Sequence, residues 1–422
     1  MAGSQWPETE NGFCPFFSTA AQYRWFVVVL AWAAHFTYYV IYSSIGIMGP
    51  VLKIDMNLSN TQFGILCGAI GVGTTLAQIP AGIWCDRLGV RSVMTVAFIF
   101  IAILTFVFSL GSGFAIPALV LLGIGLAVGC SQIAAAKAVI DWFPYAGRAT
   151  AMGIKQTGIN IGGIVGSVVL PMLLGLYGWR LLYKTMGGLA LLFGVCFWLL
   201  FRDILNARKD FAAQSDGLGL KNALVSLKDT RFLCVTAAGV FLLIVQFAFS
   251  SYLILYLNQG VHYTLKVSGF VLALSFAVGA IGRVGWGVVS DYIIKSRETT
   301  LAIVALLGTA SIIALAVITP STPVWFLYLL AIFLGVTVMG WFGIWLALVG
   351  ELSQGKSTGL GLGLSLFFAN LGLLLGPPLF GILTDIFKSF SVAWFFIAFC
   401  MGIASPLMLV GKRSPAGTRE DA

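Results

Sequence analysis

Charged side chains are scarce in this sequence. Asp, Glu, Lys and Arg together make up 9% of its 422 residues, whereas soluble domains carry about 25%. A chain with so few charges cannot cover a water-facing surface, so a soluble globular protein is excluded. The mean hydropathy of +0.99 and the 59% of hydrophobic residues agree with this and indicate an integral membrane protein.

Residues that bind metals or form disulfides are also few. The sequence has two histidines and seven cysteines, and no Cys-x-x-Cys spacing occurs, so we expect no metal and no cofactor. It also lacks a Walker loop, a His-x-x-x-His pair and a nucleophile elbow. We therefore do not expect an enzyme.

Long apolar runs follow one another along the chain. Each is long enough to cross a hydrocarbon core of about 30 Å, and in lipid a helix satisfies its own backbone groups. We predict an all-α integral membrane protein with twelve transmembrane helices, at residues 25–52, 61–84, 93–111, 114–140, 149–176, 181–201, 232–257, 267–290, 300–318, 324–349, 359–383 and 391–411.

Basic residues alternate between the loops. With the N-terminus inside, the inner segments hold sixteen Lys and Arg residues and the outer loops hold four, at Lys53, Arg180, Lys266 and Lys388. This positive-inside bias predicts a multi-pass protein of the plasma membrane, or of the inner membrane in a bacterium, with both termini cytoplasmic. The net charge of +9 is thus an orientation signal, and we expect lipid but no nucleic acid as a partner.

The halves of the chain repeat each other faintly. Gly82-x-x-x-Asp86 closes the second span and Gly287-x-x-x-Asp291 closes the eighth, at an offset of 205. Duplication is how many transporters are built. We predict a cytoplasmic segment at 1–24, a six-helix bundle at 25–201, a cytoplasmic linker at 202–231, a second six-helix bundle at 232–411 and a cytoplasmic tail at 412–422, with pseudo-two-fold symmetry between the bundles.

The loop Gly82-Ile-Trp-Cys-Asp86-Arg87-Leu-Gly89-Val-Arg91 resembles the signature loop of the major facilitator superfamily. Val90 fills one of its basic positions, and the second copy is weaker because Tyr292 follows Asp291. The stretch Asp141-Trp-Phe-Pro144 followed by Arg148-Ala-Thr-Ala-Met-Gly153 is similar to a loop of the organic-anion branches, namely the oxalate/formate exchangers, monocarboxylate porters and anion–cation symporters.

The resemblance implies a secondary transporter that works by alternating access. It also implies a cytoplasmic gate, formed here by Gly82, Asp86, Arg87, Arg91, Arg148 and Asp291. In this gate Asp86 is expected to accept hydrogen bonds from a helix N-terminus or a basic side chain. The glycines are expected to let their helices pack closely against neighbours.

The ionisable residues inside the predicted spans are cationic. Lys155 and Arg283 lie about 10 Å and 12 Å from the cytoplasmic ends of their spans, at 1.5 Å per residue. One cation from each half at similar depth favours a central anion site. The alternatives are a snorkelling lysine and an arginine bound to backbone carbonyls. Lys137 has Asp141 at i+4, so we expect a structural pair.

Polar residues near these cations complete the candidate site. The candidate substrate-binding residues besides Lys155 and Arg283 are Gln156, Asn160, Tyr38, Tyr42, Gln246, Tyr252 and Asn370. His35 is the only histidine in a span, and because imidazole titrates near neutral pH it is the candidate for proton coupling. A satisfied core histidine is the alternative.

Two functions remain open. The first is transport of a small organic anion, a mono- or dicarboxylate, by H⁺ symport or anion exchange, by a monomer. The second is export of neutral or lipophilic molecules, with structural cations. Drug antiporters of the superfamily usually carry Gly-Pro in the fifth span, where this sequence has Gly166-Ser167, which favours the first.

Overall fold

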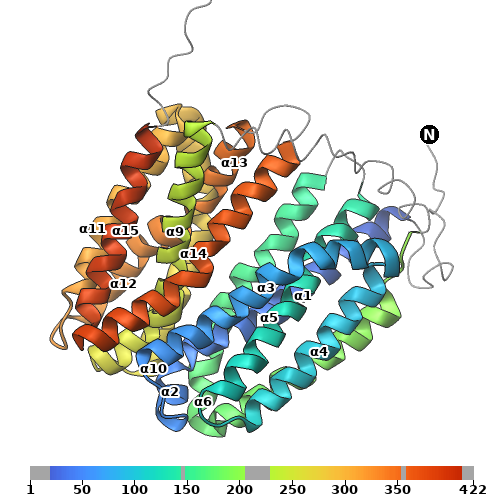
Figure 1. Cartoon of the computed structure of the whole chain (residues 1–422), viewed down its shortest axis with the longest axis horizontal. Coiled ribbons are helices and arrows are strands. Elements are labelled where there is room, and N and C mark those ends of the chain that lie inside the picture. Colours follow the sequence, from blue (N-terminus) through green and yellow to red (C-terminus); the bar gives the residue numbers. More distant parts are fainter. Residues whose placement is uncertain (1–19, 144–147, 205–228, 353–357, 411–422) are drawn as a thin grey trace, which may run out of the picture. The chain divides into compact units, whose positions relative to one another are not determined.

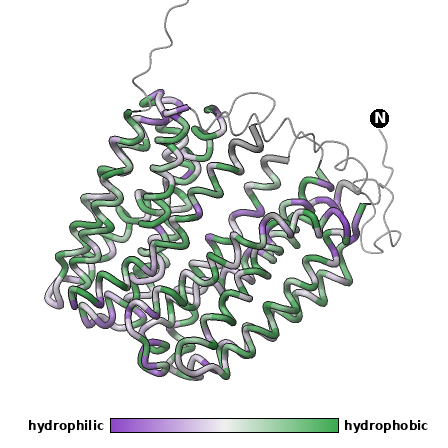
Figure 2. The backbone as a smooth tube through the Cα atoms, in the orientation of Figure 1, coloured by the Kyte–Doolittle hydropathy of each residue, from purple (hydrophilic) through white to green (hydrophobic). Residues whose placement is uncertain are grey.

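The computed structural model describes residues 20–143, 148–204, 229–352 and 358–410, and most of them are helical (Figure 1). Most of the predicted linker, together with residues 1–19 and 411–422, lies outside the described residues. Hydrophobic residues run along the helices, and hydrophilic residues gather toward helix ends (Figure 2). This distribution is the one that a bilayer imposes.

The chain divides into two compact units. Unit 1 consists of Met1–Leu58 and Ile65–Ser215, and unit 2 consists of Ser59–Gly64 and Asp216–Ala422. The division near residue 215 falls within the predicted linker. The short segment Ser59–Gly64 departs from the predicted bundles, because it precedes the linker by about 150 residues in the chain and yet belongs to unit 2.

The helices of unit 1 are α1 (Ala20–Ile47), α2 (Gly49–Asp55), α3 (Asn60–Leu88, of which unit 1 holds the part from Ile65 onward), α4 (Val90–Leu110), α5 (Ala115–Trp142) and α6 (Arg148–Leu200). The predicted first span, 25–52, is too long. The helix ends at Ile47, and Gly49 and Pro50 begin the separate helix α2. Proline suits the first turn of a helix because the N–H that it lacks has no partner there.

Helix α6 is two spans joined at a sharp bend. Its 53 residues would extend about 80 Å if straight, well beyond a hydrocarbon core. Gly178 has φ 70° and ψ 159°, a conformation that glycine adopts without steric penalty. The bend therefore separates the predicted fifth and sixth spans.

Unit 2 contains α9 (Thr230–Leu255), η1 (Tyr256–Gly260), α10 (Leu265–Val288), η2 (Val289–Ile294), α11 (Arg297–Ala316), α12 (Val324–Leu334), η3 (Gly335–Met339), α13 (Phe342–Leu352), α14 (Thr358–Phe387) and α15 (Phe390–Val410). The η elements are single π-helical turns. One of them, η3, interrupts the predicted tenth span and separates α12 from α13.

The described helices give the predicted number of spans. Ten helices are long and apolar enough to cross a membrane, and the bent pair Asn60–Gln78 and Pro80–Leu88 makes an eleventh span. Because Gly178 divides α6 in two, the count becomes twelve. The predicted all-α membrane fold is confirmed.

Glycines set the packing of helices within each unit. In unit 1 a Cβ atom on Gly158 would lie 2.5 Å from the carbonyl oxygen of Trp32, and one on Gly162 would lie 3.0 Å from that of Phe36. Helix α6 therefore approaches α1 along a glycine face, as the small-xxx-small spacing predicts. In unit 2, Gly372 of α14 makes the same kind of approach, 2.2 Å from the carbonyl oxygen of Val240 in α9.

Candidate functional site

Lys155 of α6 is a buried cation in unit 1. Only 6% of its surface is exposed. Among the residues that the structure describes, no carboxylate lies within salt-bridge distance of its ammonium, and no hydrogen-bond acceptor contacts it. The glycine contact at Gly158, one turn further along α6, holds this part of the helix against α1. An unpaired buried charge is unfavourable unless a ligand compensates it.

His35 lies on the facing side of α1. Its side chain is 2% exposed, and its Nδ1 lies 3.0 Å from the carbonyl oxygen of Ala31. Its Cβ lies 3.0 Å from the position that a Cβ on Gly158 would take, one turn along α6 from Lys155. The structure thus brings the predicted proton-coupling candidate and the predicted anion ligand of unit 1 together at the interface of α1 and α6.

Tyrosines continue this face of α1 toward Ile47. Tyr38 is 1% exposed, its ring centroid lies 5.2 Å from that of His35, and its hydroxyl accepts a hydrogen bond from Nε2 of Gln132 at 3.1 Å. Tyr42 stacks on Tyr39 with 5.6 Å between ring centroids. The hydrogen bond between Gln132 and Tyr38 ties α1 to α5 through polar groups.

The other two predicted ligands of unit 1 lie on α6. Gln156 is exposed and Asn160 is half-buried. Their positions differ from the face of Lys155 and Gly158, which is buried against α1. Within unit 1, therefore, Gln156 and Asn160 are more accessible than Lys155. Both stay predictions.

Arg283 of α10 is half-buried in unit 2 and contacts the π-helical turn η3. Its Nε donates to the carbonyl oxygen of Met339 at 3.1 Å, and its guanidinium carbon lies 5.9 Å from the centroid of the Phe342 ring. Trp286 Nε1 donates to the carbonyl oxygen of Val336 at 2.9 Å. A π-turn breaks the regular ladder of backbone hydrogen bonds, so η3 presents carbonyls to α10.

The contact with Met339 is the alternative predicted for Arg283, an arginine bound to a backbone carbonyl. It uses one of the five N–H donors of the guanidinium. An anion-binding role for the remaining donors stays a prediction. No sequence signal marks η3, because neither proline nor a polar run interrupts the span there.

The other predicted ligands of unit 2 differ in burial and in hydrogen bonding. Gln246 has a buried Oε1 without a hydrogen-bond partner among the described residues. Asn370 is half-buried. Tyr252 is fully buried, and its hydroxyl donates to the carbonyl oxygen of Asn60 at 2.6 Å. The contacts of Tyr252 are those of a packing residue, whereas Gln246 retains an unused acceptor.

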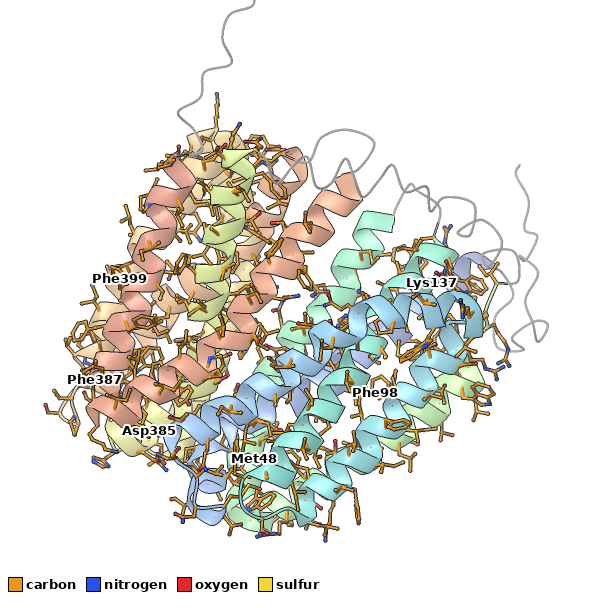
Figure 3. All side chains as sticks on the ribbon, in the orientation of Figure 1. Met48, Phe98, Lys137, Asp385, Phe387 and Phe399 are labelled. Atoms are coloured by element: carbon orange, nitrogen blue, oxygen red, sulfur yellow. The ribbon has the colours of Figure 1, made fainter. Side chains whose placement is uncertain are left out.

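An acid–cation–acid cluster occupies the signature-loop end of unit 1. It consists of Asp86, Lys137 and Asp141: the ammonium of Lys137 lies 3.1 Å from Asp86 and 3.5 Å from Asp141 (Figure 3 labels Lys137). The i,i+4 spacing predicts the second contact. The first shows that the signature aspartate has a basic partner inside its own unit, on α5.

The other predicted gate residues of unit 1 are placed as follows. Arg87 is exposed. A Cβ on Gly82 would meet no described atom within 4 Å, so the expected close packing at this glycine is absent, and the same holds for Gly287 of unit 2. The side chain of Arg148 lies outside the described residues.

Asp203, which the sequence-based prediction missed, caps helix α4. Its Oδ1 accepts from the backbone N–H of Val90 at 2.8 Å, and both its carboxylate oxygens lie 3.3 Å from the backbone nitrogen of Arg91. The side chain of Arg91 donates to the carbonyl oxygen of Trp198 at 2.7 Å and stacks over its ring. These bonds fix the loop that follows Asp86.

Unit 2 carries a counterpart of the acid–cation–acid cluster. Arg297 lies 3.6 Å from Asp291 and 2.8 Å from Glu351. Asp291 corresponds to Asp86 in the repeat, and Glu351 closes the tenth span as Asp141 closes the fourth. Arg297 comes from the start of α11, whereas Lys137 comes from α5. The sequence repeat therefore has a structural equivalent with a different source of the cation.

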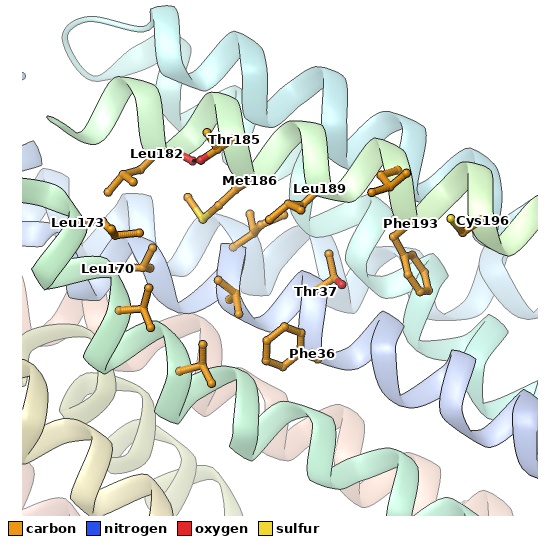
Figure 4. A pocket seen from close by; sticks show the side chains of 15 residues that line it. Phe36, Thr37, Leu170, Leu173, Leu182, Thr185, Met186, Leu189, Phe193 and Cys196 are labelled. Atoms are coloured by element: carbon orange, nitrogen blue, oxygen red, sulfur yellow. Dashed lines mark hydrogen bonds between the residues drawn. The ribbon is translucent and has the colours of Figure 1, made fainter. Parts of the chain in front are cut away.

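Unit 1 also has an apolar groove, between α1 and the two halves of α6 (Figure 4). Its volume is about 450 Å³. Phe36, Leu182, Met186 and Phe193 contribute to its walls, and Thr37 and Thr185 are the only hydroxyl-bearing residues there. None of the candidate anion-site residues is among the described residues that line this groove, so the groove is distinct from the candidate anion site.

Two units of membrane-spanning helices, each with an acid–cation–acid cluster at its repeated motif, define a polytopic membrane protein built by duplication. The sequence model of the Major Facilitator Superfamily matches residues 31–363, and the chain belongs to this family.

Curated relatives cover nearly the whole chain. The hexuronate transporter of Bacillus subtilis (strain 168) is 23% identical over 426 residues, which is 94% of this chain and 97% of that protein. A protein named probable galactarate/D-glucarate transporter GudP, from the same strain, is 23% identical and covers 92% of each chain.

Solved structures show the same fold. A bacterial homologue of the human lysosomal transporter Spinster, in an inward-facing and occupied conformation, superposes with a TM-score of 0.81 at 17% identity, covering 96% of this chain and 98% of that chain. The D-xylose–proton symporter gives a TM-score of 0.73 at 16% identity, covering 92% and 97%.

Proposed function

We propose that this protein is a secondary transporter that moves a small organic anion across the membrane by alternating access. The observation that carries the proposal is Lys155, a buried ammonium without a carboxylate partner among the described residues. Relatives that span the chain are named for hexuronate and for galactarate and glucarate. Sugar acids, which combine carboxylates with hydroxyls, are therefore the first substrates to test.

Lys155 and Arg283 are the proposed anion ligands. An ammonium acts as a point charge, whereas a guanidinium binds a carboxylate through two parallel hydrogen bonds. The hydroxyl- and amide-bearing residues Tyr38, Tyr42, Gln156, Asn160, Gln246, Tyr252 and Asn370 stay the proposed ligands for the rest of the substrate.

A panel of ligands tests this function. Purified protein is heated with mono- and dicarboxylates, including hexuronates and aldarates, and with neutral sugars as controls. A ligand that binds only the folded state raises the melting temperature. At a concentration one hundred times its dissociation constant it increases the free energy of unfolding by about 2.7 kcal/mol. Stabilisation by lipophilic compounds alone would support the export alternative and contradict anion transport.

A matched pair of lysines tests the site. In Lys155→Gln, uptake of the stabilising anion into proteoliposomes should fall at least tenfold, because the central charge is lost. Lys184→Gln removes an exposed lysine of the same helix and should transport normally. Equal uptake by both variants would refute the role of Lys155.

We propose H⁺ symport through His35, with anion exchange as the other mode. His35→Gln keeps a donor for the carbonyl of Ala31 but cannot titrate. In symport this variant should lose accumulation driven by a pH gradient while counterflow of labelled substrate continues. Unchanged accumulation would assign the proton to another group or to the substrate itself.

We also propose that both termini lie in the cytoplasm, that the membrane is the plasma membrane, or the inner membrane in a bacterium, and that the transporter works as a monomer. The asymmetry of basic residues between the loops supports the orientation.

A further inference from the structure

A second apolar groove of unit 1, which we call the α4–α5 groove, runs between α4 and α5 beside the end of α3. Its volume is about 500 Å³. Small residues leave this space, because Ala97 of α4 and Gly123 and Ala127 of α5 line the groove. A Cβ on Gly123 would lie 2.8 Å from a methyl carbon of Leu104. The two helices therefore come together at this end of the groove.

The rim of the α4–α5 groove faces the hydrocarbon of the membrane. Leu88, Val96 and Phe100 lie on the rim, and each is more than half exposed. Both α4 and α5 are long and apolar enough to cross a membrane, so lipid chains and not water meet these side chains. From Ser92 to Leu104 the groove follows α4 over twelve positions, about 18 Å of helix. This length is close to the depth of one leaflet, which is half of a hydrocarbon core of about 30 Å.

The end of the groove at the signature loop carries a cation without a counter-charge. Arg87 directly precedes Leu88 and is exposed. Its side chain has no ion pair and no hydrogen bond among the described residues. The neighbouring carboxylates are already bound, Asp86 by Lys137 and Asp203 by backbone N–H groups of α4. The charge of Arg87 is therefore available to an anion from outside the protein.

We propose that the α4–α5 groove binds one anionic phospholipid, with an acyl chain in the groove and the phosphate at Arg87. Basic residues beside membrane spans attract acidic headgroups, and Arg91 adds a second guanidinium at this end, stacked over Trp198. The chain fills a space that would otherwise be void, and so restores dispersion contacts to the residues that line it. A zwitterionic lipid gains less, because its cationic group finds no unpaired carboxylate there.

Two further observations bear on this site. The indole of Trp84 lines the groove at the same end and is 47% exposed, and tryptophan is typical of the headgroup level. Neither Lys155 nor Arg283 is among the described residues that line the groove. The lipid site is therefore distinct from the proposed site for the transported anion.

A photoreactive lipid tests the site on the purified, delipidated protein. Phosphatidylglycerol with a diazirine near the middle of one acyl chain is bound and illuminated, and peptide mass spectrometry locates the cross-links. Most of them should fall on the segments of α4 and α5 that line the groove. Phosphatidylcholine with the same chain should label these segments about fivefold less at equal concentration, the effect of about one basic residue at a membrane surface.

Two variants separate the headgroup from the chain. Arg87→Gln should remove the preference for phosphatidylglycerol, because the unpaired charge is lost. Val96→Trp should lower labelling of the groove by both lipids at least about threefold, because the indole takes the place of the chain. Both positions are exposed, so neither change disturbs the core. Lys184→Gln and Val195→Trp are the matched controls at exposed positions of α6 outside this groove, and should keep wild-type labelling.

Cross-links spread equally over the exposed faces of α4 and α6 would show that bulk lipid merely surrounds the protein, and would overturn the site. A preference for phosphatidylglycerol that persists in Arg87→Gln would do the same. Glycerol 3-phosphate in large excess should not compete, and competition would assign the cation to soluble phosphates instead of lipid. Because the measurement uses no carboxylate substrate, its result is independent of the ligand panel that tests the proposed function.

Discussion

Lys155 and Arg283 are predicted to have the same role, but their surroundings differ. Lys155 is buried with no counter-charge among the described residues. Arg283 is half-buried and already donates to the carbonyl oxygen of Met339. Desolvation penalises both charged groups, but only the arginine regains part of that free energy from the protein itself. We therefore expect Lys155 to depend more on the anion than Arg283 does.

Substitution of Arg283 separates charge from geometry. Arg283→Gln should lower uptake of the anion at least tenfold, because the charge is lost. Arg283→Lys should lower it about two- to tenfold, because a lysine keeps the charge but not the bidentate geometry. The measurement is initial uptake into proteoliposomes at several substrate concentrations. Wild-type uptake by both variants would exclude Arg283 from the anion site.

The surroundings of Lys137 indicate a role in stability. Its side chain is 15% exposed and serves the carboxylates of both Asp86 and Asp141. Removal of the cation leaves two half-buried acids to repel each other. Lys137→Ala should therefore lower the free energy of unfolding by about 1–3 kcal/mol, between the values for exposed and buried pairs.

Thermal unfolding in detergent measures this loss. Adding Asp86→Asn and Asp141→Asn to Lys137→Ala should restore part of the stability, because neutral amides do not repel each other. A triple variant that is less stable than Lys137→Ala would contradict the electrostatic origin of the loss.

At the scale of elements, glycine faces decide which helices approach closely. The spacing of Gly158, Gly162 and Gly166 predicts such a face, and the structure shows that its partner is α1. The spacing cannot name the partner, because the same pattern fits any neighbouring helix. The π-helical turn η3 had no such signal. The turn leaves backbone carbonyls available, and Arg283 and Trp286 reach them because α10 packs beside it.

The glycine face predicts opposite effects at two positions of α6. Gly158→Ala should destabilise the protein by about 1–3 kcal/mol, because its Cβ would overlap the carbonyl oxygen of Trp32. Gly188→Ala meets nothing within 4 Å and should be neutral or stabilising by up to about 1 kcal/mol, since alanine favours helix. Melting temperatures of the two variants measure the contrast, and equal effects would contradict it.

At the scale of the whole molecule, the two units repeat the same arrangement of charged side chains. Asp86 with Lys137 and Asp141 in unit 1 corresponds to Asp291 with Arg297 and Glu351 in unit 2. The acids keep their places at the ends of corresponding spans, while the cation comes from a different helix in each unit. The position of negative charge is therefore what the repeat preserves.

The orientation in the membrane is testable with reporter fusions. A fluorescent protein joined after residue 410 should be fluorescent, and alkaline phosphatase joined there should be inactive, because the tail is predicted to be cytoplasmic. Fusions at residue 112, in a predicted outer loop, should give the reverse. Phosphatase activity at the C-terminus would overturn the predicted orientation.

The sequence by itself determined the membrane spans, the predicted orientation, the repeat and the inventory of buried cations, because hydropathy and charge are properties of short segments. The tertiary structure alone decided where those side chains point. It placed Lys137 beside Asp86, Arg283 against η3, and the first turn of α4 on Asp203. Val90 and Asp203 are 113 positions apart in the chain. No local pattern specifies such a contact, since it exists only when the backbone of one helix meets the end of another.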